Sequence, residues 1–120
     1  MTTLVEYTDE FGAWWQDLTE SQQDDVAATI ALLEEQGPRL PFPLSSGVTR
    51  SRHSHMRELR IQSGGGPLRV FYAFDPRRQA ILLIGGDKTG DNRFYQVMIP
   101  RADDLYDRYL TELRQEGLIP

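Results

Sequence analysis

The chain has 120 residues, of which 39% are hydrophobic and 10% aromatic; it carries a net charge of −5 and no cysteine, which excludes disulfides and thiolate chemistry. This length and composition fit one compact domain with a single core, residues 1–120, and leave no room for a second. No run approaches the roughly 18 apolar residues that a membrane-spanning helix needs, and no export signal is visible, so we expect a cytoplasmic protein without a membrane partner.

The first third of the chain predicts a short strand and two helices. Leu4–Tyr7 has the pattern of a strand, and one residue of the pair Thr8–Asp9 caps a brief helix that follows it. A second helix begins after Thr19, which forms a capping box with Gln22, and it ends at Gly37–Pro38. The first helix directs four apolar side chains inward: Phe11, Trp14, Trp15 and Leu18.

The middle of the chain predicts an antiparallel meander. Pro38–Gly47 contains three prolines and is expected to be a loop. Turns at Ser63–Pro67 and Asp75–Arg78 separate the strands that come next. The last strand contains the continuous apolar run Ala80–Ile84, which is typical of a strand covered on both faces. The three predicted strands are Met56–Gln62, Leu68–Phe74 and Gln79–Gly85.

The end of the chain has helical sequence that a proline interrupts. We expect Pro100 to divide a short helix, Phe94–Ile99, from a longer one, Ala102–Gln115. The element order is then β-α-α-β-β-β-α. This order predicts an α+β fold in which two amino-terminal helices and a carboxyl-terminal helix pack on one side of a small, mainly antiparallel sheet.

Charge is distributed unevenly along the chain. Residues 1–38 hold nine acids and no Lys or Arg, residues 39–78 hold eight Arg against two acids, and residues 79–120 hold five bases against seven acids. Twelve of the 13 bases are Arg, whose planar guanidinium matches phosphate oxygens. The middle third therefore predicts a basic patch that attracts phosphate, although a coding bias toward Arg explains the same composition.

The apolar pattern of the first hairpin predicts its register. Pairing that keeps one face apolar sets Leu59 opposite Val70, and it therefore sets Arg60 opposite Arg69 on the other face. Like charges directly across from each other are unfavourable unless an anion binds between them. The pair is a candidate phosphate clamp. The alternative is an ordinary surface cluster that Glu58 and other carboxylates neutralise.

Two histidines precede this strand and are candidates for proton transfer. Cleavage of RNA by internal attack requires a deprotonated 2′-OH, a stabilised phosphorane charge and a protonated leaving oxygen. His53 and His55 suit either proton transfer because the pKa of imidazole lies near neutrality. Spacing suggests no third ligand, so no metal is expected, and both histidines are alternatively plain loop residues.

Lys88 is the only lysine in the chain, and it follows a glycine pair at the exit of the last strand. Loops at strand ends commonly hold functional groups. Tyr95 is expected either to stack on a base of single-stranded RNA or to pack in the core. The residues predicted to bind RNA around the catalytic candidates are Arg50, Arg52, Arg57, Arg93 and Tyr95.

Three successive runs carry a resemblance to a known family. Met56–Ile61 contains Glu-Leu-Arg, Pro67–Asp75 contains Leu-Arg-Val-Phe-Tyr, and Ile81–Thr89 leads into Asp-Lys-Thr. In this order and spacing they resemble the RelE/ParE toxin superfamily, in its HigB-like, phage-derived Gp49-like branch, where an E-L-R strand, a Y-R-V-F-Y strand and a strand leading into K-K-T follow one another. The flanking helices look similar, so the resemblance covers nearly the whole chain.

The resemblance implies a RelE-like fold and a toxin of a type II toxin–antitoxin system. Such a toxin is a ribosome-dependent endoribonuclease that needs no metal or cofactor. It cuts translated mRNA and inhibits translation and growth until an antitoxin with a helix-turn-helix neutralises it, and it meets DNA only through that antitoxin.

The resemblance also assigns residues. Arg60 looks like the arginine of E-L-R, Arg69 like the arginine of the next strand, and Lys88 like the last lysine of K-K-T. The chain departs from the pattern at Asp87, where lysine is frequent, and at Leu68, where an aromatic residue is usual. Asp87 weakens the local positive field, so slow cleavage or altered ribosome binding is expected.

Two other functions are compatible with the same sequence. One is a toxin of the same fold that poisons a DNA topoisomerase by binding it, without nuclease chemistry. The other is a regulatory binding module of phage origin.

Overall fold

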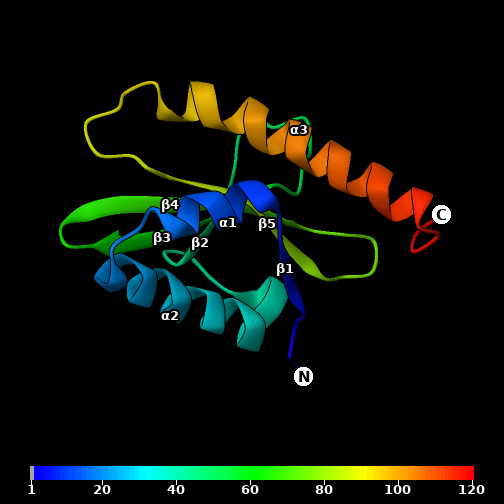
Figure 1. The fold of residues 1–120 in the computed structure, drawn as a ribbon, viewed down its shortest axis with the longest axis horizontal. Helices are drawn as coiled ribbons and strands as arrows, with labels where there is room; N and C mark the ends of the chain where they lie inside the picture. Colours follow the sequence, from blue (N-terminus) through cyan, green and yellow to red (C-terminus); the bar gives the residue numbers. More distant parts are fainter. Residues whose placement is uncertain (1) are drawn as a thin grey trace.

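A five-stranded sheet lies between helices in the computed structural model, which describes residues 2–120 (Figure 1). The sheet has the strand order β1-β5-β4-β3-β2. The elements, in chain order, are β1 (Val5–Tyr7), α1 (Asp9–Gln16), α2 (Glu20–Gln36), the 3-10 helix η1 (Gly37–Arg39), β2 (Ser45–Gly47), β3 (Arg57–Ser63), β4 (Gly66–Phe74), β5 (Ala80–Asp87) and α3 (Phe94–Gln115).

Threonine caps start the first two helices, as predicted. The Thr8 hydroxyl accepts a hydrogen bond from the Phe11 backbone N–H at 3.0 Å, which satisfies one of the free donors of α1. Thr19 and Gln22 form the complete capping box at the start of α2, with distances of 3.1 and 2.9 Å.

The predicted antiparallel meander is confirmed, and two short strands extend it. β3, β4 and β5 pair antiparallel in sequence order, β1 joins β5 in parallel, and β2 joins β3. The prediction that Pro38–Gly47 is all loop was wrong at its end, because Ser45 pairs with Leu59. Three residues are too few to show an alternating pattern. The β3–β4 turn contains Gly64 and Gly65, both with positive φ, as a tight hairpin turn requires.

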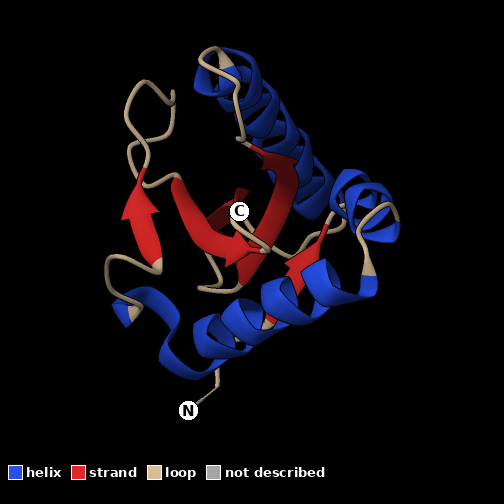
Figure 2. Cartoon of the chain, turned by 90° about the vertical axis from the view of Figure 1, so that its left-hand side faces the viewer, coloured by secondary structure: helices blue, strands red, loops and turns tan. Residues whose placement is uncertain are grey.

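The helices cover both faces of the sheet, which corrects the expectation that they lie on one side. Helices α1 and α2 pack over one apolar cluster, and α3 packs over another on the opposite face. Figure 2 shows helices on both sides of the strands. The cause is that side chains on both faces of the central strands β4 and β5 are apolar and buried, so each face needs a cover.

Helix α3 runs without a break from Phe94 to Gln115, so the predicted division at Pro100 was wrong. A proline inside a helix leaves the carbonyl four residues earlier without its partner. Here Pro100 and Gln96 are both exposed, so water can satisfy that carbonyl while the buried side of α3 continues. No helix within residues 2–120 is both long and apolar enough to cross a membrane.

Candidate functional site

Arg60 and Arg69 occupy the register that the apolar pattern predicted. Arg60 of β3 lies directly opposite Arg69 of β4, and both side chains lie on the α3 face, where each approaches Glu58. Their environments differ. The Arg60 side chain is 31% exposed, whereas that of Arg69 is 7% exposed. Arg60 is therefore the more accessible of the two arginines to a ligand from solvent.

Glu58 lies between the two arginines and is itself buried. Its carboxylate is 3.8 Å from Nη1 of Arg60 and 3.5 Å from Nε of Arg69. Nε of Arg69 forms no hydrogen bond, and Nη1 of Arg69 donates to the Leu68 carbonyl at 3.0 Å. The negative charge of Glu58 offsets the repulsion between the opposed guanidinium groups. Glu58 therefore contacts both arginines, as the alternative of neutralisation by a carboxylate requires, but the cluster is largely buried and not on the surface.

Tyr95 and Lys88 complete the cluster from the start of α3 and the loop before it. The Tyr95 hydroxyl donates to Oε1 of Glu58 at 2.7 Å. Burial, and then this hydrogen bond, raise the pKa of Tyr95, so the hydroxyl keeps its proton. The Lys88 ammonium lies 5.2 Å from the centre of the Tyr95 ring, within range of a cation–π contact.

The cluster borders two hollows in the surface. One, of about 240 Å³, is lined by residues 47–50 together with Glu58, Tyr95 and Ile99. The other, of about 500 Å³, reaches Arg60 and Arg69 from the side of α2 and the turn before β2. Glu58 is thus reached through the first hollow, and the two arginines through the second.

The two histidines contact the middle of α3, away from this cluster. His53 Nε2 lies 2.7 Å from Oδ1 of Asp107, and His55 Nε2 lies 3.2 Å from the Tyr106 hydroxyl. Tyr95 and Tyr106 are about 16 Å apart along a helix that rises 1.5 Å per residue. Burial, followed by the nearby charge of His53, lowers the pKa of His55. The structure therefore does not bring either imidazole to the arginines.

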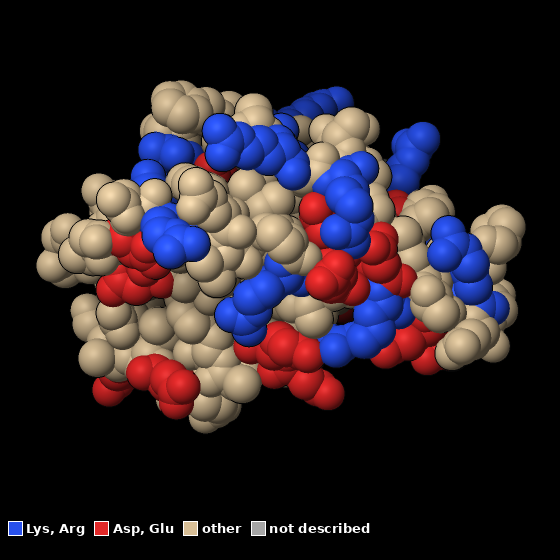
Figure 3. Space-filling view, turned by 90° about the horizontal axis from the view of Figure 1, so that it is seen from above, with Lys and Arg blue, Asp and Glu red and all other residues tan. Residues whose placement is uncertain are grey.

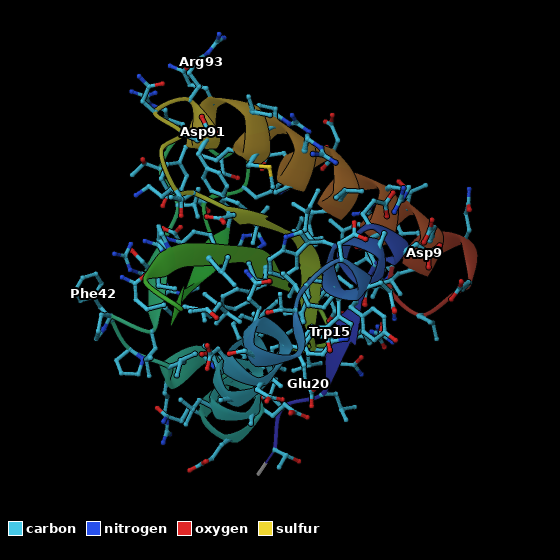
Figure 4. The ribbon with its side chains drawn as sticks, turned by 60° about the vertical axis from the view of Figure 1, so that its left-hand side comes forward. Asp9, Trp15, Glu20, Phe42, Asp91 and Arg93 are labelled. Atoms are coloured by element: carbon cyan, nitrogen blue, oxygen red, sulfur yellow. The ribbon has the colours of Figure 1, made fainter. Side chains whose placement is uncertain are left out.

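The other predicted RNA contacts fall into two groups. Arg52 is bound to α3, because it donates to Asp104 at 3.0 Å and also to Asp107. Arg57 is bound to β2, because it donates to the Ser45 hydroxyl at 3.0 Å. Arg50 and Arg93 are exposed instead. Figure 4 shows Arg93 projecting from the start of α3.

Charges of both signs mix on the outer surface of the molecule on the side where α3 lies, as Figure 3 shows. Arg77 pairs with Asp75 and Glu6, and Arg108 pairs with Glu10, so acidic partners interrupt the basic side chains. The carboxylate of Asp87, the neighbour of Lys88, accepts a hydrogen bond from the Thr89 backbone N–H at 2.9 Å. Hydrogen bonding to Thr89 lowers the pKa of Asp87. Among residues 2–120, no three His, Asp or Glu side chains are grouped as metal ligands.

Glu58 and the hydroxyl contact of Tyr95 are the features that sequence reasoning missed as parts of a site. A signal for Glu58 was present, since it is the only acid between residues 36 and 74 and alternates with Arg60 on one strand face. The Tyr95 contact had no such signal, because it joins residues 37 positions apart.

Comparison with known proteins identifies several relatives. The chain matches the phage-derived Gp49-like protein family over residues 13–107. It is 40% identical over 106 residues to HigB2 of Mycobacterium tuberculosis, covering 87% of this chain and 53% of that protein, so it spans about half the length of HigB2. It is 42% identical over 98 residues to HigB3 of the same organism, covering 81% of this chain and 84% of that protein. Both relatives are named as candidate toxins.

Solved structures show the same fold. A mutant of the Escherichia coli toxin RelE in the free state matches with a TM-score of 0.60 and 10% identity, over 82% of this chain and 96% of that one. The RelE–RelB complex of Pyrococcus horikoshii matches with a TM-score of 0.53 and 18% identity, over 75% of this chain and 99% of the matched one. These likenesses confirm the predicted RelE-like α+β fold.

Proposed function

Because the chain belongs to the phage-derived Gp49-like family, in the HigB-like branch of the RelE superfamily, we propose that it is a toxin of a type II toxin–antitoxin system and cuts mRNA on the ribosome. It acts in the cytoplasm and inhibits translation and growth until its antitoxin binds. The cluster of Arg60, Glu58 and Tyr95 is the observation that carries the nuclease part of this proposal.

The chemistry is internal attack on a phosphodiester. The 2′-oxygen of one nucleotide attacks the adjacent phosphorus, the bond to the 5′-oxygen of the next nucleotide breaks, and a cyclic phosphate and a free 5′-hydroxyl result. A proton acceptor near the 2′-OH, a cation near the phosphoryl oxygens and a proton donor near the leaving oxygen each lower the barrier. No metal is required for any of these steps.

The cluster offers a group for each task. Arg60 and Lys88 hold the scissile phosphate, and the guanidinium of Arg60 stabilises the charge that develops on it. Glu58 accepts the 2′-OH proton, and the Tyr95 hydroxyl, which keeps its proton at neutral pH, donates to the leaving oxygen. Arg69 acts through Glu58, whose carboxylate it orients from within the sheet.

The histidines have a structural role in this proposal. His53 and Arg52 attach the loop before β3 to Asp107 of α3, and the packing of His53 against Tyr106, with ring centres 4.7 Å apart, strengthens that attachment. The loop forms one wall of the smaller hollow. The exposed Arg50 and Arg93 extend the contact to the RNA backbone.

The partners follow from the same family. We propose an antitoxin that carries a helix-turn-helix, so that DNA is bound only through the antitoxin. The match to RelE in the Pyrococcus horikoshii RelE–RelB complex supports a protein partner of this kind.

Induction of the chain alone in cells tests the proposal. Wild type, Arg60→Ala and Arg101→Ala, which removes an exposed arginine of α3, are compared for growth and for new 5′ ends in transcripts. Wild type and Arg101→Ala should arrest growth and cut mRNA, whereas Arg60→Ala should do neither, because removal of a group that stabilises the transition-state charge costs on the order of a hundredfold in rate. Arrest by the wild type with intact messages, or with DNA-damage signalling, would contradict the nuclease and favour a topoisomerase poison.

A further inference from the structure

Phe42 is an exposed aromatic side chain on a constrained turn. Its ring is 69% exposed, and Figure 4 shows it projecting from the edge of the molecule. Prolines flank it on both sides and restrict the backbone. The turn is closed by hydrogen bonds from the backbone N–H groups of Leu44 and Ser45 to the Pro41 carbonyl, both at 3.0 Å. The backbone that carries the ring is thus constrained, while the ring itself stays open to solvent.

The position of the ring next to Arg60 distinguishes Phe42 from an ordinary exposed apolar residue. The central carbon of the Arg60 guanidinium lies 5.4 Å from the centre of the Phe42 ring, which is a cation–π distance. The backbone reinforces this contact, because the Arg60 N–H donates to the Leu44 carbonyl at 2.9 Å. Pro43 and Leu44 also line the larger hollow beside Arg60. An exposed π surface and a partly exposed cation therefore lie at one place on the edge of the sheet.

We propose that Phe42 is a stacking platform for a nucleobase of the bound mRNA, next to the phosphate that Arg60 holds. This inference rests on the proposed nuclease function and adds a residue that binds the base rather than the phosphate. Aromatic rings bind single-stranded nucleic acid by stacking, and every base presents a suitable face, so Phe42 contributes affinity and position without selecting a base.

Substitutions at Phe42 can separate stacking from simple apolar contact. Phe42→Ala removes the ring, Phe42→Leu keeps apolar bulk without a π face, and Phe42→Trp keeps the π face. Tyr7→Ala is the matched control, because Tyr7 is 67% exposed on β1, at the opposite edge of the sheet from β2. Both positions changed are exposed, so thermal unfolding of all four variants is expected to stay close to that of the wild type.

The experiment uses purified protein and ribosomes that carry a defined mRNA. Primer extension first maps the cut and gives kcat and the KM for the ribosome–mRNA complex. The nucleotide whose 2′-OH attacks is then replaced by its 2′-deoxy form, which blocks cleavage, and 2-aminopurine is placed on each side of the cut in turn. Stacking of 2-aminopurine on an aromatic ring quenches its fluorescence.

Stacking predicts a specific pattern. Phe42→Ala and Phe42→Leu should raise KM about tenfold, the scale of a lost base–aromatic contact, with a smaller change in kcat and with loss of the quenching. Phe42→Trp and Tyr7→Ala should resemble the wild type in both measurements.

Two results overturn the inference in distinguishable ways. In the first, the wild type cuts the mRNA, and either Phe42→Ala or Phe42→Leu retains the KM and the quenching of the wild type. Phe42 is then not a stacking platform, and its exposed ring is instead a contact for a protein partner. In the second, the wild type leaves the mRNA on the ribosome uncut; the proposed nuclease function fails, and the inference fails with it.

Discussion

Arg60 and Arg69 lie directly opposite each other on β3 and β4, but the Arg60 side chain is 31% exposed and the Arg69 side chain 7%. Both approach the buried carboxylate of Glu58. The pair is therefore not a symmetrical clamp. One guanidinium can reach a ligand, and the other mainly compensates a charge within the fold.

This asymmetry predicts different effects on stability. Arg69→Met should lower the free energy of unfolding by about 3 kcal/mol, because it removes the buried guanidinium that compensates the buried charge of Glu58. Arg60→Met should lower it by less than about 1 kcal/mol, as is usual for a partly exposed ion pair. Urea unfolding followed by circular dichroism measures both values. Equal losses in the two variants would show that burial does not distinguish the arginines.

Tyr95→Phe tests the proton donor. The change removes only the hydroxyl that bonds to Glu58, so stability should fall by about 1 kcal/mol while cleavage slows by about a hundredfold. Tyr106→Phe is the control, because its hydroxyl also bonds, to the Phe74 carbonyl at 2.8 Å, but lies at the middle of α3. Unchanged cleavage in Tyr95→Phe would exclude the hydroxyl from the reaction.

Stability at alkaline pH should depend on Tyr109. Burial raises the pKa of Tyr109, and the hydrogen bond to Glu6 at 2.9 Å raises it further. A pKa raised in the folded state means that the stabilisation is complete below the unfolded pKa of about 10 and is lost as pH rises above it. The free energy of unfolding of the wild type should therefore fall above pH ~10.

Tyr109→Phe should make that decline shallower, because the variant has no hydroxyl to ionise at this position. Unfolding in urea at a series of alkaline pH values measures the slope. Tyr7→Phe, at an exposed position, serves as the control and should retain the slope of the wild type. An identical slope in Tyr109→Phe and wild type would contradict the assignment of the alkaline transition to this hydroxyl.

Gly85 is predicted to be required for the packing of α1. A Cβ atom at Gly85 would overlap the indole of Trp14, so Gly85→Ala should cost about 3 kcal/mol of stability through overpacking. Gly12→Ala is the matched change, since the new atom would lie 3.6 Å from the Tyr7 ring, an ordinary contact, and alanine favours the helix by roughly 0.5–1 kcal/mol. Thermal unfolding should rank Gly12→Ala at or above wild type and Gly85→Ala well below it; the reverse order would refute the packing argument.

Local patterns were sufficient to predict the helix caps, the meander and the opposition of Arg60 to Arg69. A cap needs only residues three positions apart, as with Thr19 and Gln22. A hairpin register follows from the two-residue alternation of strands, because a slip by one residue would turn the apolar side chains of β3 to the wrong face.

Only the tertiary structure decided which charges are buried and what each polar group contacts. Asp107 and His53 are 54 positions apart in the sequence, and Tyr95 and Glu58 are 37 positions apart, so no local pattern predicts either contact. The same holds for Pro100, which α3 accommodates because its outer side faces water. The alternation of a strand determines which residues share a face, but how far each is exposed depends on the element that packs over that face, and here α3 covers Arg69 and leaves Arg60 partly open.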